Sequence, residues 1–130
     1  MALKHIAIDT NIAIEILNGN KATLQMLSVF DVIALPVPVC GELMYGAKNS
    51  SKAERNLAHY RAFIGSCEIL EAKLPTAWEY ANIKLNLKLA GRPIPENDIW
   101  IAAICQSYDI PFASRDGHFS YIQSLHLIGL

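Results

Sequence analysis

Residues 3–11 read LKHIAIDTN, a short apolar run that stops abruptly at three polar residues. The apolar and β-branched residues up to Ile8 favour a buried strand. The Asp-Thr-Asn triplet that follows favours the N-cap of a helix, because these short side chains accept hydrogen bonds from free backbone N–H groups. The stretch therefore predicts a strand followed at once by a helix, and the same pattern recurs along the chain.

Four more apolar runs are short enough to be strands, and turn residues or prolines bound them. They are Val32–Leu35, Cys67–Leu70, Ile110–Ala113 and Leu125–Ile128. Apolar residues at helical spacing lie between these runs, so strands alternate with helices. This alternation predicts an α/β fold, a mostly parallel sheet of about five strands that helices cover on both faces through right-handed crossovers.

The expected helices are recognised by apolar residues three or four positions apart. Two short helices flank the break at 18–20, and a longer helical stretch from Val39 to Ile64 is interrupted near 48–51 and ends at Gly65. Pro75 suits the first turn of a further helix. The apolar residues along one face of that helix are Trp78, Ala81, Leu85 and Leu89.

Composition limits the classes of function that the chain can have. At 130 residues we expect one domain, spanning residues 1–130, and 52% hydrophobic residues exclude a disordered chain. Eleven basic against twelve acidic residues give a net charge of −1, so no global positive field indicates nucleic acid or membrane binding. Any anionic partner must therefore be held locally.

Cysteine use and hydropathy indicate the compartment. The three cysteines are far apart and show no zinc-like spacing, so neither a disulfide framework nor a zinc site is expected. No apolar run approaches the roughly 20 residues that cross a bilayer. The N-terminal apolar stretch contains acidic residues and no cleavage site, so we expect a cytoplasmic protein without a membrane partner.

Four carboxylates fall where a parallel sheet gathers ligands, beyond the carboxyl ends of its strands. Asp9 follows the first strand directly, and Asp116 lies three residues beyond the fourth. Glu42 lies within the helix after the second strand, and Asp98 lies in the first turn of the helix before the fourth strand. All four can converge at one edge of the sheet.

Carboxylates gathered this closely repel one another unless a divalent cation lies between them. Mg²⁺ or Mn²⁺ fits, because both prefer oxygen and no histidine or cysteine is expected to accompany the set. A cation held with open positions lowers the pKa of a bound water and stabilises charge on a phosphoryl group. Hydrolysis of a phosphodiester is the natural chemistry of such a site.

Each carboxylate also has a simpler explanation when taken singly. Asp9 can serve only as a helix cap, and Asp98 can serve only to complement a helix dipole. Glu42 has apolar neighbours in sequence and needs a partner, unless it lies on an exposed face. Asp116 can be a turn residue. The conjunction of all four favours a catalytic site.

Four blocks of the sequence together resemble the PIN-domain family, and in particular the VapC toxins. They are IDTN at 8–11, CGELMYGA at 40–47, IPENDIWIAA at 94–103 and SRDGHF at 114–119. The blocks occur in family order and span the chain from Ile8 to Ile128. The third and fourth blocks are much more specific than any lone carboxylate.

The resemblance implies a PIN-like three-layer α/β/α sandwich and a Mg²⁺-dependent endoribonuclease that cleaves RNA with a metal-activated water. It also implies homodimers, and a toxin that a small cognate antitoxin neutralises. By resemblance, Asp9 and Asp98 would be the principal metal ligands, and Asp116 would complete the pocket directly or through water. Glu42 would orient or deprotonate the attacking water. Ser114, where the family often has threonine, would hold a water or the scissile phosphate.

Other residues near these blocks are expected to play supporting parts. Asn11 and Asn97 resemble residues that orient the ligands. Arg115 beside the last aspartate, and Lys48 and Lys52 near the break between the two central helices, are candidate contacts for RNA phosphates. An ordinary solvated surface is the alternative for the two lysines.

No catalytic role is assigned to the histidine and aromatic residues of the chain. His118 and Phe119 belong to the last family block, and we expect them to pack or to fix the loop. Trp78 lies amid apolar residues at helical spacing, which is typical of a core or dimer contact.

Four other functions are alternatives to the toxin. A receiver domain has similar length and an acidic Mg²⁺ pocket, but it needs a second acidic residue beside Asp9 and a lysine after the last strand, and no lysine follows residue 88. A nucleotide-binding module is poorer, because no glycine-rich phosphate loop occurs. A non-catalytic PIN protein conflicts with the intact quartet, and a housekeeping RNA-processing nuclease with the same fold is the nearest alternative.

Overall fold

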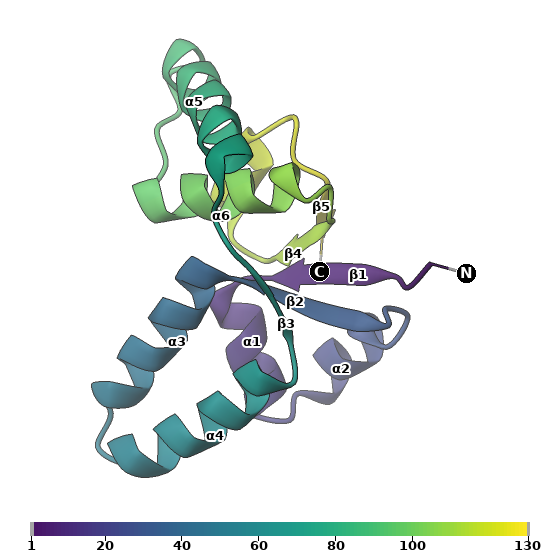
Figure 1. Cartoon of the computed structure of the whole chain (residues 1–130), viewed down its shortest axis with the longest axis vertical. Helices are drawn as coiled ribbons and strands as arrows, with labels where there is room; N and C mark the ends of the chain where they lie inside the picture. The colour runs from purple at the N-terminus through teal and green to yellow at the C-terminus, as the bar shows by residue number, and fades with distance from the viewer. Residues whose placement is uncertain (1, 130) are drawn as a thin grey trace.

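The computed structural model describes residues 2–129 and contains a five-stranded parallel sheet of order β3-β2-β1-β4-β5 (Figure 1). The strands are β1 (His5–Ile8), β2 (Val32–Pro36), β3 (Glu68–Leu70), β4 (Phe112–Ser114) and β5 (Leu127–Gly129). Every neighbouring pair of strands is parallel. The predicted α/β class and parallel sheet are confirmed.

Helices cover both faces of the sheet. They are α1 (Thr10–Leu17), α2 (Lys21–Leu27), α3 (Val37–Lys48), α4 (Ala53–Gly65), α5 (Leu74–Leu89) and α6 (Glu96–Ser107), followed by the 3₁₀ turn η1 (Gly117–Tyr121). Figure 1 shows α1 to α4 below the strands and α5 and α6 above them. The predicted three-layer α/β/α sandwich is therefore confirmed.

The strand order reverses direction once, between β1 and β4. The chain first adds β2 and β3 on one side of β1, then returns through α5 and α6 to add β4 and β5 on the other side. Because right-handed crossovers are strongly preferred, this reversal moves the later helices to the opposite face. Parallel sheets bind ligands at such a reversal, beyond the carboxyl ends of the strands.

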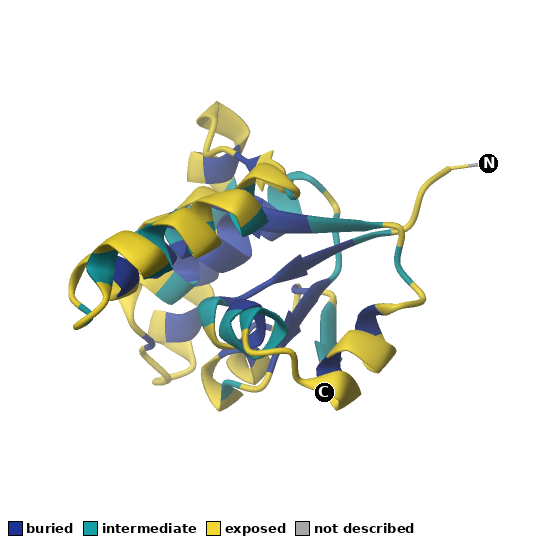
Figure 2. Ribbon diagram, turned by 90° about the horizontal axis from the view of Figure 1, so that it is seen from below, coloured by how far each residue is buried: buried dark blue, intermediate teal, exposed yellow. Residues whose placement is uncertain are grey.

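The core is centred on β1, β4 and α6. Ile6, Ala7 and Ile8 are fully buried, and residues 101–105 of α6 are buried without interruption. Figure 2 shows the buried strands between helices whose outer faces are exposed. Phe119 of η1 packs edge-to-face on Phe112, with ring centroids 4.7 Å apart, so the loop after β4 is fixed to the core. Over residues 2–129, no helix is both long and apolar enough to cross a membrane.

The largest difference from the sequence prediction concerns α5. Trp78, Ala81, Leu85 and Leu89 share a face as predicted, but that face is exposed. The buried residues of α5 are Thr76, Ile83 and Leu87, on the opposite side. Apolar residues occur on both sides of this helix, so helical spacing alone could not tell which side packs on α6.

All five strands also differ from the prediction by one or two residues at an end. β3 begins one residue later than expected, and β4 and β5 each begin two residues later and end one residue later. β1 begins at His5, and Leu3, which was expected to belong to the strand, is 62% exposed. β2 includes Pro36 and leads directly into α3, where Pro38 occupies the first turn. Proline is tolerated there because the first N–H groups of a helix have no partner within the helix.

Gly91 follows α5 with a φ of +67°, a left-handed conformation that non-glycine residues adopt at a cost. A Cβ at this position would have no atom within 4 Å, so the cost of Gly91→Ala is conformational. We expect the free energy of unfolding to fall by about 1 kcal/mol in urea denaturation. Gly65→Ala, also without neighbours within 4 Å but outside the left-handed region, is the matched control. An equal loss in both variants would contradict this explanation.

Candidate active site

All four predicted carboxylates line one cavity of about 160 Å³ at the carboxyl ends of β1 and β4. Its lining residues are Asp9, Thr10, Asn11, Glu42, Asp98, Ile101, Asp116 and Phe119. They come from the start of α1, the middle of α3, the first turn of α6 and the loop after β4. Four segments far apart in sequence thus meet where the sheet reverses its strand order.

Asp9 is buried, with 6% of its surface exposed, and both of its oxygens are occupied. As the N-cap of α1, Oδ1 accepts the Ile12 N–H at 2.9 Å. Oδ2 accepts the hydroxyl of Ser114, and that hydroxyl in turn accepts the N–H of Asp116 at 3.0 Å. Burial raises the pKa of the Asp9 carboxyl despite these hydrogen bonds. Asp9 is therefore both a helix cap and a member of the acidic cluster.

Asp98 and Asp116 face each other with a histidine between them. His118 Nδ1 lies 3.2 Å from Asp116 Oδ1 and 3.5 Å from Asp98 Oδ2. One ligand atom from each of the three residues lies within 4.8 Å of the others. Burial is the main cause that raises the pKa of Asp98, and the charges of Asp116 and Glu42 add to it.

The expectation that no histidine accompanies the carboxylates is wrong. Asp116 caps the turn η1 by accepting the backbone N–H of His118 at 2.9 Å. This tight turn brings the imidazole back over the carboxylates. The signal in the sequence was the Asp-Gly-His run, whose glycine and capping aspartate are typical of a turn.

Glu42 lies on an exposed face of α3 rather than among apolar residues. The Thr10 hydroxyl donates to its Oε1 at 2.7 Å. Thr10 was not singled out in the sequence beyond its capping character, although its position directly after Asp9 could have indicated a role. The pair holds the Glu42 carboxylate at the cavity through one oxygen.

The predicted supporting residues fall in different places. Asn11 lines the cavity, whereas Asn97 is exposed and is not part of its lining. Lys48 ends α3 and Lys52 precedes α4, and both are exposed and outside the lining. Arg115 does not line the cavity, and its guanidinium donates two hydrogen bonds to Glu15 on α1.

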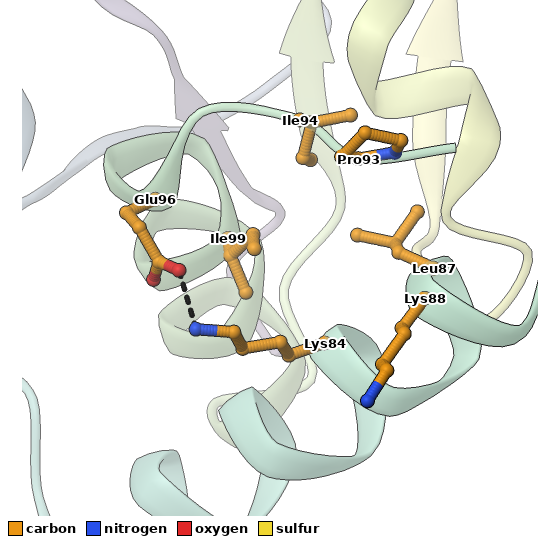
Figure 3. A pocket seen from close by; sticks show the side chains of 7 residues that line it. All are labelled: Lys84, Leu87, Lys88, Pro93, Ile94, Glu96 and Ile99. Carbon is orange, nitrogen blue, oxygen red and sulfur yellow. Dashed lines mark hydrogen bonds and ion pairs between the residues drawn. The ribbon is translucent and has the colours of Figure 1, made fainter. Parts of the chain in front are cut away.

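A larger cavity of about 360 Å³ lies between α5 and the start of α6 (Figure 3). Its walls are apolar side chains, including Leu87, Ile94 and Ile99. The Lys84 ammonium is paired with the Glu96 carboxylate across it. The lining also includes Lys88, and its one carboxylate, Glu96, is already paired with Lys84. Two lysines and one paired carboxylate are a poor ligand set for a cation, so the smaller acidic cavity is the candidate active site.

A family model described as PIN domain matches residues 6–125. The chain belongs to the PIN-domain family. Among its relatives is Ribonuclease VapC2 of Haemophilus influenzae, which is 35% identical over 113 residues, 84% of this chain and 84% of that protein. The resemblance inferred from the four sequence blocks is confirmed, and this PIN domain is of the VapC type.

Solved structures share the fold over nearly the whole chain. VapBC-1 from nontypeable Haemophilus influenzae matches with a TM-score of 0.88 and 25% identity, covering 96% of this chain and 97% of that one. VapBC2 from Rickettsia felis, bound to a DNA fragment from its promoter, matches with a TM-score of 0.87 and 24% identity, covering 97% and 98%. The α/β/α architecture is therefore that of VapC proteins.

The donor set of this PIN domain suits a divalent cation. Carboxylate oxygens are the ligands that Mg²⁺ and Mn²⁺ prefer, and an imidazole nitrogen is better accepted by Mn²⁺ and later transition metals than by Mg²⁺. Without a cation, several partly buried carboxylates repel one another. Burial is the main cause that raises the pKa values of Asp9 and Asp98, and the charges of neighbouring carboxylates raise them further.

The sign of the Asp98 shift leads to a stability prediction. A carboxyl whose pKa is raised by folding binds its proton more tightly in the folded state, so its ionised form opposes folding above the ordinary pKa. In chelator at pH 7, we expect Asp98→Asn to raise the Tm by about 3 °C. Thermal unfolding of Asp31→Asn, an exposed carboxylate outside the cavity, serves as the control. A lower Tm for Asp98→Asn would show that its charge stabilises the fold.

Proposed function

We propose that this chain is the endoribonuclease toxin of a VapBC-type pair and that it hydrolyses RNA phosphodiester bonds with Mg²⁺, or Mn²⁺ as a substitute. The observation that carries the proposal is the convergence of Asp9, Glu42, Asp98 and Asp116 in one cavity of a PIN domain. Relatives that bear the name Ribonuclease VapC support the activity on RNA.

In this proposal Asp98 and Asp116 hold the cation with Asp9, and His118 is close enough to take part. When bound, the cation supplies a water of lowered pKa and offsets the negative charge that grows on the phosphoryl group. The Ser114 hydroxyl fixes the Asp9 carboxylate, which keeps its oxygens in one orientation. The protein thus contributes a pre-arranged set of oxygens.

Glu42 is the proposed general base. Its Oε1 is held by Thr10, which leaves Oε2 to accept a proton from the attacking water. Its exposed position on α3 suits a group that must exchange that proton with solvent. The residues that line the cavity then position this water in line with the scissile bond.

The proposed partners follow from the same assignment. Structural neighbours of the chain are VapBC complexes, so a cognate antitoxin is the proposed protein partner. The acidic cavity offers a basic side chain of that antitoxin a charge-assisted contact that would compete with cation and RNA. The proposed place of action is the cytoplasm, where RNA is available.

Purified chain without antitoxin is expected to cut total cellular RNA at discrete sites in Mg²⁺ or Mn²⁺ and to be inactive in EDTA. Asp9→Asn and Asp98→Asn remove ligand charge, so each should lower the rate on the order of 100-fold. Asp31→Asn, which lies outside the cavity, should retain the wild-type rate. Sequencing of the cut ends identifies the target and shows which fragment carries the phosphate.

Intact RNA with wild type and variants alike, under conditions where the protein is folded and binds Mg²⁺, would overturn the nuclease assignment. Growth arrest on expression separates a toxin from a housekeeping nuclease. We expect arrest with wild type and none with Asp98→Asn.

The chain is further proposed to form a homodimer through the exposed face of α5. We call Leu74, Trp78, Ala81, Leu85 and Leu89 the α5 stripe. Four of its members are 85%, 71%, 54% and 75% exposed, in the order Leu74, Trp78, Leu85 and Leu89. An uncharged stripe along a whole helix is self-complementary, since a second α5 packed across it by a two-fold axis buries both.

Light scattering after size exclusion tests the dimer. Leu85→Asp places a charge at the middle of the α5 stripe, and we expect it to yield a monomer at concentrations where wild type is dimeric. Val29→Asp, at an apolar residue outside α5 that is 65% exposed, should leave the dimer unchanged. A dimer that persists in Leu85→Asp would place the interface on another face.

A further inference from the structure

Arg115 lies between two residues of the candidate site but its side chain leaves that site. Its Nε donates to Glu15 Oε2 at 3.0 Å, and its Nη2 donates to Glu15 Oε1 at 2.9 Å. Nη2 also donates to the Thr23 hydroxyl at 3.2 Å, and that hydroxyl donates to Glu15. Three segments, α1, α2 and the loop after β4, are thus joined by one guanidinium.

Glu15, Arg115 and Thr23 form a bidentate ion pair with a buried third partner rather than a loose surface pair. The two parallel N–H···O bonds match the planar fork of arginine to a carboxylate. Thr23 is completely buried, so its hydroxyl depends on these partners. Hydrogen bonds from Arg115 and Thr23 lower the pKa of Glu15 to about 2, which keeps it ionised at any physiological pH.

The Glu15–Arg115–Thr23 cluster fixes the short connection between β4 and η1, which carries Asp116 of the acidic cluster. β4 ends at Ser114 and η1 begins at Gly117, so only residues 115 and 116 join them. Ser114 binds Asp9 on one side and the N–H of Asp116 on the other. If Arg115 were released, both hydrogen bonds would lose the anchor that holds this two-residue connection in place.

We propose that Glu15 and Arg115 form a positioning pair that holds Ser114 and Asp116 in the geometry that binds the cation. The inference rests on the proposed function, because it assigns a purpose to that same site. Arg115 then acts through α1 and α2, in contrast to its sequence-based interpretation as a contact for an RNA phosphate.

The geometry favours positioning over direct RNA contact. Glu15 and Thr23 take up three of the five N–H donors of Arg115, and turning the planar fork towards a phosphate would break all three bonds. Glu15 would then be left ionised without its partner, which is costly for a group only partly exposed. The side chain of Arg115 is 40% exposed, but its donors towards α1 are already in use.

The test measures cation affinity directly, without RNA. Isothermal titration with Mn²⁺ and Mg²⁺ should show dissociation constants about 10-fold higher for Glu15→Gln and for Arg115→Gln than for wild type. The double variant should lose no more than either single variant, because both remove the same unit. Glu68→Gln, which breaks the pair with His5 at the other end of β1, is the matched control and should bind as wild type does.

Two milder variants keep the test valid if Arg115→Gln fails to fold. Arg115→Lys keeps the charge but lacks the fork, and Thr23→Val keeps the buried shape but lacks the hydroxyl. Each should raise the dissociation constant less than Arg115→Gln, and circular dichroism verifies that the variants are folded. Wild-type cation affinity in both of these variants would overturn the proposed positioning role of Glu15 and Arg115.

RNA kinetics separate the two roles of Arg115. If cation affinity is unchanged in Glu15→Gln and Arg115→Gln while KM for RNA rises only in the arginine variant, Arg115 is a phosphate contact and the proposal is wrong. If wild type does not cut RNA but the predicted loss of cation affinity is found, the nuclease assignment fails and the positioning pair stands. A wild-type chain that binds neither cation would overturn both.

Discussion

The pairing of β1 with β4 is the interaction on which the rest of the structure depends. Ile8 lies opposite Ala113, and the N–H of Asp9 donates to the carbonyl of Ala113. This parallel pair is where the sheet reverses its direction of growth, and it leaves the carboxyl ends of two strands side by side. Asp9, directly after β1, and Ser114, the last residue of β4, are therefore brought into contact.

The acidic cavity is stabilised by the fold around it and not by its own charges. Burial and mutual repulsion disfavour ionised Asp9 and Asp98, while fixed donors favour them. Ile12 supplies an N–H from a helix start, and Ser114 supplies a hydroxyl from the neighbouring strand. A core helix carries Asp98 and the packed turn η1 carries His118, so the oxygens cannot simply move apart. A cation bound in the cavity would relieve this repulsion.

Much of this arrangement could be predicted from the sequence. Asp9 and Asp116 were found because each follows an apolar strand, and Asp98 because helix starts are marked by capping residues. The buried face of α5 could not be predicted, since both sides of that helix carry apolar residues. His118 was misjudged because its place depends on a 3₁₀ turn, and the Glu15–Arg115 pair was not predicted, because its residues are 100 positions apart. Contacts that depend on tertiary packing leave no periodic signal.

The distance in sequence between the two halves of the cavity also affects when the site can form during protein synthesis. Asp9 and Ser114 are 105 positions apart, and α6 and β4 lie in the later part of the chain. During synthesis, a nascent chain that has not yet reached β4 can form β1, β2 and their helices but cannot assemble the four carboxylates. Such a chain has an incomplete acidic cavity. The cavity is therefore complete only after the strand that completes the sheet reversal has left the ribosome and paired.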